Sequence, residues 1–108
     1  MKRIGILYNP RIQAAHDFSK ETAKFLATLK ASCWQCSSQD DDKICSQIEG
    51  TEMVLCVGGD GTVLRAARAL APYSVPIVGV NLGKLGFLTE LKMTDVHDRL
   101  PALLKGEG

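Results

Sequence analysis

The chain has 108 residues, of which 45% are hydrophobic and 23% charged, and its formal net charge is +1. Its length suits one domain of roughly 50 to 200 residues. The small net charge argues against a nucleic-acid partner, and no apolar run approaches the roughly 20 residues that a membrane span requires. We therefore expect a globular, cytoplasmic protein whose partners include neither nucleic acid nor membrane.

The first half of the chain alternates between strand and helix signals. Residues 2–8 form an apolar run that stops at the turn signal Asn9-Pro10, which predicts a strand. Residues 33–36 predict another short strand. Between them, residues 14–30 predict an amphipathic helix whose apolar side chains recur at steps of three and four, at Ala15, Phe18, Phe25, Leu26 and Leu29.

The alternation continues in the second half. Residues 37–50 place serines and an acidic run before Ile44 and Ile48, which predicts a short helix with capping side chains at its start. Residues 52–57 are almost continuously apolar, as in a parallel strand that is covered on both faces. Three segments complete the prediction: a helix over 62–70, a strand over 76–80 and a helix over 94–105 disturbed at Pro101.

This alternation predicts an α/β fold: a three-layer, mostly parallel, Rossmann-like sheet with helices on both faces. Ligands of such folds bind at the carboxyl ends of the strands. Two glycine-rich segments, one over 58–61 and one within 78–88, follow predicted strands or overlap their ends. We therefore expect the binding site where these two segments meet.

The cysteines suggest neither a redox nor a zinc site. Cys33 and Cys36 have CxxC spacing, but residues three apart in a strand point to opposite faces, whereas a redox pair stands at the start of a helix. A zinc site usually has a second close pair, and Cys45 and Cys56 fall in separate elements. We expect reduced and mostly buried thiols.

A Gly58-Gly59-Asp60-Gly61 segment stands between a predicted buried strand and a predicted helix. Glycines permit positive φ angles and the close approach of a bulky anion, and free N–H groups at a helix start can donate to it. The chain contains neither GxxxxGK[ST] nor GxGxxG, so a P-loop and a dinucleotide-binding fingerprint are unsupported. The segment is either a phosphate cradle or a tight turn in which Asp60 only caps the helix.

Residues 58–62, GGDGT, resemble the signature shared by NAD kinases, diacylglycerol and sphingosine kinases and 6-phosphofructokinases. The segment VGVNLGKLGFL at 78–88 resembles the NAD kinase pattern GxNxGxLGFL, and the Pro-x-Gly-Thr-x-Asn-Asp type of stretch seen in lipid kinases does not occur. The resemblance implies that residues 1–108 are the N-terminal α/β domain of an NAD kinase. It also implies transfer of the γ-phosphoryl of ATP, or of polyphosphate, to the 2′-hydroxyl of the adenosine ribose of NAD, giving NADP with a divalent metal such as Mg²⁺.

The resemblance assigns a catalytic role to Asp60, which matches the aspartate that engages the 2′-hydroxyl. A carboxylate at a helix start is a weak base, and a loose phosphoryl-transfer transition state needs little base strength. We therefore expect Asp60 to orient the hydroxyl, and to help hold the metal, more than to remove a proton. The candidate binding residues are Gly58, Gly59, Asp60, Gly61, Arg65, Asn81 and Phe87.

Several of these residues also have plainer interpretations. Arg65 lies a little over one helical turn past the glycine loop, where it either reaches a phosphate or ribose or is a solvated or ion-paired arginine. Phe87 either packs against the adenine half of NAD, as the resemblance implies, or belongs to the core. Lys84 is expected to be a solvated loop residue, and His16 and His97 to be exposed helix residues without a catalytic role.

In the family, a second, largely β domain completes the active site with an Asn-Asp or Asn-Glu pair and a glycine- and threonine-rich segment. Neither occurs here. We therefore expect an N-terminal part of an enzyme that forms homo-oligomers when complete. A lipid or sugar kinase of the same superfamily, a non-catalytic nucleotide-binding module and a functionless fragment remain alternatives, and the sequence leaves the choices between ATP and polyphosphate and between NAD and NADH open.

Overall fold

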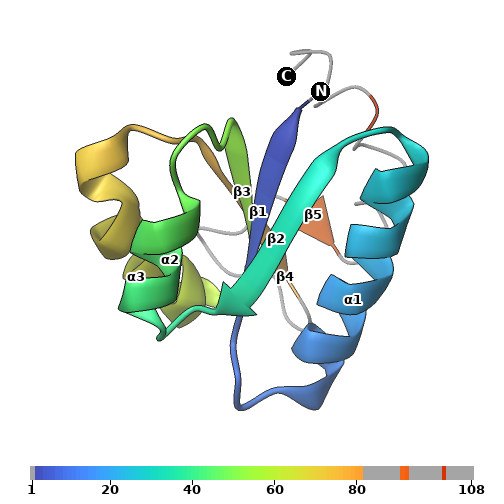
Figure 1. Cartoon of the computed structure of the whole chain (residues 1–108). Coiled ribbons are helices and arrows are strands. Elements are labelled where there is room, and N and C mark those ends of the chain that lie inside the picture. The colour runs from blue at the N-terminus through green and yellow to red at the C-terminus, as the bar shows by residue number, and fades with distance from the viewer. Residues whose placement is uncertain (1, 82–90, 93–100, 102–108) are drawn as a thin grey trace.

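The computed structural model describes the backbone of residues 2–81, 91–92 and 101, and their side chains except those of 60, 81, 91 and 92. Within this part, the strands form one five-stranded sheet in which every pairing is parallel. The strands are β1 (Arg3–Tyr8), β2 (Ser32–Ser37), β3 (Met53–Gly58), β4 (Ile77–Asn81) and β5 (Leu91–Lys92), in the order β2-β1-β3-β4-β5 (Figure 1).

Helices cover both faces of this sheet (Figure 1). The helix α1 (Gln13–Thr28) lies on one face, and α2 (Asp41–Gln47) and α3 (Asp60–Leu70) lie on the other. A short 3₁₀ turn, Ala71–Tyr73, follows α3. The predicted three-layer, parallel α/β fold is therefore confirmed.

Each face of the sheet has its own apolar core. Under α1, alternate residues of β1 and β3 such as Ile4, Ile6 and Leu55 pack against Phe18 and Leu26. On the other face, the second cluster packs beneath α2 and α3, and it comprises Leu7, Trp34, Cys36, Ile44, Ile48, Val54, Cys56, Ala66 and Leu70.

The central strand β3 is buried along its whole length, as its continuous apolar run predicted. Cys33 packs against the α1 cluster, whereas Cys36 belongs to the cluster on the opposite face. The two thiols of the CxxC spacing are thus separated by the sheet, as the strand geometry predicted.

The helix boundaries differ from the prediction by one or two residues. The helix α1 ends at Thr28 rather than Lys30, because Lys30 takes a positive φ of 61°. The predicted cap of α2 is confirmed, since the Asp40 carboxylate accepts a hydrogen bond of 3.1 Å from the Lys43 N–H.

Two elements were not predicted: the 3₁₀ turn and β5, which pairs Leu91 with Val80 and Lys92 with Asn81. Only two residues long, β5 is too short to give a periodic signal. The helix predicted over 94–105 lies outside the described residues. Among the described helices, none has the length and apolar character needed to span a bilayer.

Candidate functional site

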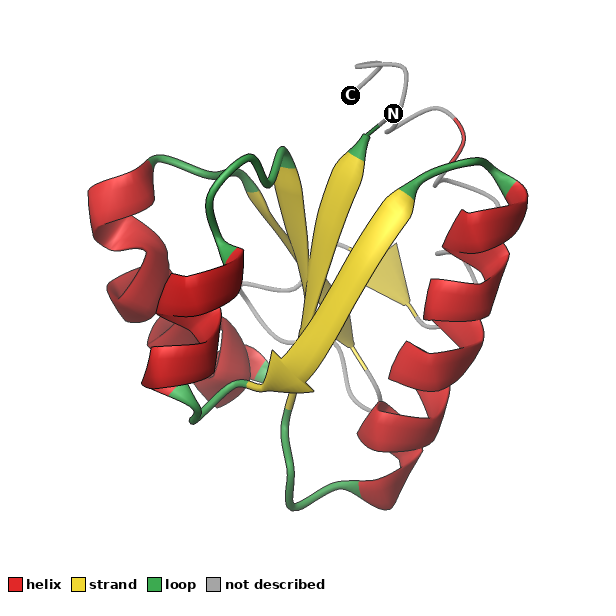
Figure 2. Cartoon of the chain, viewed as in Figure 1, coloured by secondary structure: helices red, strands yellow, loops and turns green. Residues whose placement is uncertain are grey.

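The candidate site lies where the sheet order reverses direction. From β1 the chain crosses to β2 on one side and then returns to β3 on the other. The connection after β1 leads to α1 on one face, and the connection after β3 leads to α3 on the opposite face, so the two loops diverge at the carboxyl ends of the strands (Figure 2). Such a switch point is where α/β sheets of this order bind ligands.

A crevice of about 290 Å³ occupies this switch point. Its walls come from the segments that follow β1, β2 and β3. They comprise Asn9, Ile12, Ser38, Gln39, Gly59, Gly61, Thr62 and Arg65.

Backbone hydrogen bonds hold these walls in place. The Asn9 N–H donates to the Val57 carbonyl at 3.0 Å, which ties the end of β1 to β3. The Ser38 N–H donates to the Tyr8 carbonyl at 2.8 Å, which ties the end of β2 to β1. The Asn9 side chain also accepts from the Arg11 N–H at 2.9 Å and so closes the turn before α1. The crevice is therefore built on rigid strand ends.

The helix α3 begins at the crevice. Gly59 is its N-cap residue, in an extended conformation, and the Gly59 carbonyl accepts from the N–H groups of Thr62 and Val63 at 3.1 and 3.2 Å. Asp60 is the first helical residue and Gly59 holds the N-cap position, so Asp60 is not the N-cap residue. The first amide groups of a helix have no acceptor within it and can donate to a ligand.

Among the glycines of this loop, Gly58 is required because a side chain there has no space, and none of the three has a positive φ angle. Positive φ was expected here, but among the described glycines only Gly50 has it. A Cβ on Gly58 would collide with the Thr62 side chain. A Cβ on Gly59 or Gly61 would meet nothing within 4 Å, because both residues border open space. Gly58 is thus a packing residue, and Gly59 and Gly61 leave room beside the helix start.

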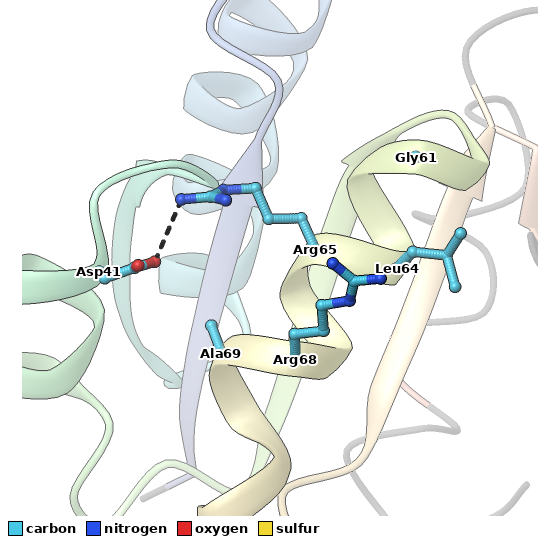
Figure 3. Close-up of a pocket in the computed structure, with 6 residues that line it drawn as sticks. All are labelled: Asp41, Gly61, Leu64, Arg65, Arg68 and Ala69. Carbon is cyan, nitrogen blue, oxygen red and sulfur yellow. Dashed lines mark hydrogen bonds and ion pairs between the residues drawn. The ribbon is translucent and has the colours of Figure 1, made fainter.

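Arg65 bridges α3 and the loop that follows β2. Its Nε donates to the Ser38 carbonyl at 3.1 Å, and one terminal nitrogen lies 3.3 Å from the Gln39 carbonyl and 3.4 Å from the Asp41 carboxylate (Figure 3). The Arg65 side chain remains 45% exposed. Arg65 is therefore ion-paired and at the same time lines the crevice, so the two interpretations of this residue are compatible.

A second depression, here called the outer hollow, adjoins the crevice along α3. It has a volume of about 420 Å³ and shares Gly61 and Arg65 with the crevice. Its other lining residues are Asp41, Leu64, Arg68 and Ala69 (Figure 3). The described surface thus offers two adjacent concavities on either side of Arg65.

The second glycine-rich segment reaches the site through β4. Asn81, its first polar residue, ends β4 and pairs with Gly58 in the parallel register. The backbones of the two motifs therefore run side by side at the carboxyl edge of the sheet. Gly83, Lys84 and Phe87 lie outside the described residues.

The cysteines and His16 take no part in the crevice. All four cysteines are free, and burial raises the pKa of Cys33 and Cys36 to about 11 and that of Cys56 to about 12. Cys36 and Cys56 are buried, Cys33 is half-buried and only Cys45 of the four is exposed, so the expectation of mostly buried thiols is confirmed.

His16 was predicted to be exposed, but it is half-buried, with its ring 5.0 Å from that of Tyr8. The two rings meet because His16 lies on the first turns of α1 beside the end of β1. His97 lies outside the described residues.

Five residues of the crevice were not predicted as site residues from the sequence: Asn9, Ile12, Ser38, Gln39 and Thr62. Asn9 was interpreted only as part of a turn, and Ser38 only as part of a capping segment. The signal that identifies Asn9, Ser38 and Gln39 is their position, because they come just after β1 and β2, at the carboxyl edge of the sheet beside the switch point.

Comparisons with known proteins agree on one family. A family model described as the ATP-NAD kinase N-terminal domain matches residues 16–108. An NAD kinase from Dehalococcoides mccartyi is 42% identical over 107 residues, which are 99% of this chain and 38% of that protein. An NAD kinase from Moorella thermoacetica is 39% identical over 115 residues, covering 98% of this chain and 36% of that protein.

The fold is also similar to a solved structure. The crystal structure of yeast NADH kinase complexed with NADH matches with a TM-score of 0.67 and 15% identity, over 99% of this chain and 39% of that chain. The chain thus spans less than two fifths of the length of these relatives. With a family model that covers most of its residues and relatives about 40% identical along nearly its whole length, the chain belongs to the ATP-NAD kinase N-terminal domain family.

Proposed function

We propose that this domain forms part of an NAD kinase, in a protein as long as its relatives. The reaction is transfer of the γ-phosphoryl of ATP, or of polyphosphate, to the 2′-hydroxyl of the adenosine ribose of NAD, which gives NADP. The observation that carries this proposal is the meeting of the two motifs at the carboxyl edge of the sheet, where Gly58 of β3 pairs with Asn81 of β4. The loop after β3 leads from this pairing to the start of α3 and lines the switch-point crevice through Gly59 and Gly61.

The chemistry of the crevice suits phosphoryl transfer. The reaction asks mainly for positioning and for stabilisation of negative charge. The first amide groups of α3 supply donors with a favourable helix dipole, and Gly59 and Gly61 leave space for a phosphoryl group beside them. Asp60, as the first residue of α3, orients the acceptor hydroxyl in this proposal.

Arg65 and the second motif would bind the dinucleotide. The carbonyls of Ser38 and Gln39 hold the Arg65 guanidinium beside the crevice, so part of its conformational entropy is already lost before a ligand binds. Asn81 and Phe87 are proposed as further dinucleotide contacts, with Phe87 against the adenine-containing half. Gly58 supports this surface by its packing against Thr62.

A divalent metal such as Mg²⁺ fits this loop if the Asp60 carboxylate and the substrate phosphates hold it together. The described residues contain no group of three metal-binding side chains. Mg²⁺ in phosphoryl-transfer sites is commonly held by one or two carboxylates together with substrate phosphates and water. Asp60 is the carboxylate of the loop that could serve in this way, and the metal would neutralise charge on the phosphates.

The remaining parts of the proposal concern the complete protein. We propose that a second, β-rich domain completes the dinucleotide pocket, that the complete protein forms homo-oligomers, and that it acts in the cytoplasm. The length of the relatives, more than twice that of this chain, supports the presence of further structure around the site.

The test is NADP formation from NAD, ATP and Mg²⁺ by a protein of the relatives' length that contains this domain. Asp60→Asn should abolish turnover, whereas Asp42→Asn, which removes an exposed carboxylate from the first turn of α2, should leave it unchanged. NADP formation that survives Asp60→Asn would remove the catalytic role of that residue. Phosphorylation of a lipid or sugar in place of NAD would make the NAD kinase proposal wrong.

A further inference from the structure

The strand β2 forms one edge of the described sheet, and no described strand pairs with its outer side. The Ser32 and Ser38 N–H groups donate hydrogen bonds of 2.7 and 2.8 Å to carbonyls at the two ends of β1. Successive residues of a strand direct their backbone groups to opposite sides, so the residues whose N–H and carbonyl groups face outward are Cys33, Gln35 and Ser37. Figure 1 shows α1 and α2 on either side of β2, with no described segment in front of it.

The strand β2 lacks the features that normally prevent an edge strand from pairing with another chain. Such strands usually carry a charged residue, a proline or a bulge, or are very short. The sequence of β2, SCWQCS, contains no charge and no proline, and all six residues pair with β1 in an uninterrupted register. The outer side of β2 can therefore accept a further strand.

The charges that flank β2 are complementary to those of a second copy of the chain. Lys30 precedes the strand and Asp40 follows it, and both are exposed. The two residues lie five positions to either side of Gln35. A two-fold axis through Gln35, which is the commonest symmetry of protein dimers, makes two copies of β2 antiparallel. Lys30 of each copy is then brought beside Asp40 of the other, so the two ends attract each other.

Gln35 supplies an independent reason for this pairing. Its side-chain Oε1 is buried but accepts no hydrogen bond from the described residues. Such an atom has lost its contact with water without gaining a partner, which is unfavourable. In an antiparallel pair centred on Gln35, the same residue of the second copy lies directly opposite, with the two Cα atoms about 5.5 Å apart. Once the two side chains turn toward each other, the amide group of one copy can donate to the Oε1 of the other.

We propose that β2 is the interface of a two-fold symmetric dimer, in which it pairs antiparallel with β2 of a second copy and joins the two sheets into one. Gln35 exchanges backbone hydrogen bonds with Gln35 of the second copy, and Cys33 does so with Ser37. The proposal rests on the homo-oligomer of the proposed function and deepens it by naming the surface and the symmetry.

Amide hydrogen exchange of the ¹⁵N-labelled chain, followed by NMR over a series of protein concentrations, tests this pairing residue by residue. The outward N–H groups of Cys33, Gln35 and Ser37 should exchange at least about tenfold more slowly at concentrations where the dimer dominates. The N–H groups of Trp34 and Cys36 face β1 and should be protected at every concentration. Sedimentation of the same samples should show the mass rising toward twice the 11.7 kDa of one chain.

Gln35→Lys should weaken dimerisation about tenfold or more, because it places two like charges directly opposite each other on the two-fold axis. Ala67→Lys is the matched control, since it adds the same charge at an exposed position of α3, which packs on β3 and β4 away from the β2 edge. This control should leave dimerisation unchanged. A dispersed NMR spectrum of each variant verifies folding.

Several results would make the proposal wrong. One is a chain that stays monomeric at every concentration, and another is equal weakening by the two lysine variants. A dimer in which the outward N–H groups still exchange rapidly would be formed by another surface. Protection of these groups in a monomeric chain would mean that the chain's own residues cover the edge.

The test is independent of catalysis, because no turnover is measured. A monomeric chain within a longer protein that is oligomeric would remove this interface and leave the proposed homo-oligomer intact. A longer protein that makes no NADP would contradict the proposed activity and leave the β2 pairing unaffected.

Discussion

Thr62 occupies the space into which a side chain on Gly58 would project. A Cβ on Gly58 would lie 3.0 Å from the Thr62 Cβ and closer still to its hydroxyl, and 3.3 Å from the Asn9 Cβ. Gly58 ends β3, Thr62 lies in the first turn of α3, and Asn9 follows β1. This contact therefore fixes the direction in which α3 leaves the sheet beside the crevice.

Gly58→Ala should destabilise the domain. The new methyl group has no room because Gly58 and Thr62 are both buried, so the strand end or the helix start has to shift. Overpacking of this kind costs about 1–3 kcal/mol in the free energy of unfolding. Urea unfolding followed by circular dichroism measures the difference.

A double variant tests whether Thr62 is the cause. Thr62→Ala removes the hydroxyl that the new methyl group would meet, so Gly58→Ala should cost less in its presence than alone. If the losses in the free energy of unfolding of the two single variants simply add up in the double variant, the methyl group introduced at position 58 does not meet the Thr62 side chain.

Gly61→Ala should lower NADP formation without lowering the free energy of unfolding. Gly61 lies in the first turn of α3 with open space around its Cβ position, so alanine should keep stability or raise it by up to about 1 kcal/mol through helix propensity. The same methyl group projects toward both concavities and should lower NADP formation by the longer protein. Unchanged kinetics would show that substrates do not approach α3 at this point.

The architecture is well predicted from the sequence because each face of the sheet has one apolar cluster, and each cluster is built from regularly spaced apolar residues. The alternation of strands and helices and the continuous burial of β3 follow directly from apolar periodicity, which the structure confirms in α1 through buried Ala15, Phe18 and Leu26. Local patterns were sufficient here because each helix packs on the strands that flank it in the chain.

The candidate site was only partly predictable. The two glycine-rich segments were expected to meet at the carboxyl edge of the sheet, and the pairing of Gly58 with Asn81 in adjacent parallel strands confirms that they lie side by side. The interactions of Arg65 with Ser38, Gln39 and Asp41 join residues at least 24 positions apart, and no local pattern encodes such a contact. The positive φ expected at Gly58 does not occur, because a steric requirement and a requirement for positive φ look the same in a sequence.

Thr51→Val should destabilise the domain because it removes a buried hydrogen bond made by Trp34, the one tryptophan of the chain. The Trp34 indole N–H donates to the Thr51 hydroxyl at 2.8 Å in a buried position, and that hydroxyl itself donates to the Gln47 carbonyl at 3.2 Å. Valine has a similar shape but leaves the indole N–H without its partner, at a cost of about 1–3 kcal/mol. Urea unfolding followed by Trp34 fluorescence reports the change at the residue concerned.

Thr51→Ser is the matched control for this prediction. Serine keeps the hydroxyl and loses only a methyl group, so it should cost clearly less than valine. If serine destabilises the domain as much as valine does, the methyl group of Thr51 contributes as much as its hydroxyl, and the hydrogen bond to Trp34 is not the dominant contribution of this residue.

The buried thiols should weaken the fold in alkaline solution. Burial raises the pKa of the Cys56 thiol to about 12, whereas a thiol in an unfolded chain titrates near 8.5. Above about pH 8.5 the unfolded chain therefore releases a proton that the folded chain retains, so the free energy of unfolding falls as pH rises toward 12, by up to about 1.4 kcal/mol per pH unit for this thiol. Below about pH 8.5 the Cys56 thiol is protonated in both states and contributes no dependence.

Cys56→Ala isolates this contribution, because lysine, tyrosine and the other thiols titrate in both proteins. Urea unfolding between about pH 7.5 and about pH 10.5 should give a shallower loss of stability for the variant than for the wild type, whatever the difference in their stabilities at neutral pH. Parallel curves would mean that the Cys56 thiol ionises at the same pH in the folded and unfolded chains. That result would be incompatible with a thiol enclosed by Leu7, Val54 and the α3 face of the sheet.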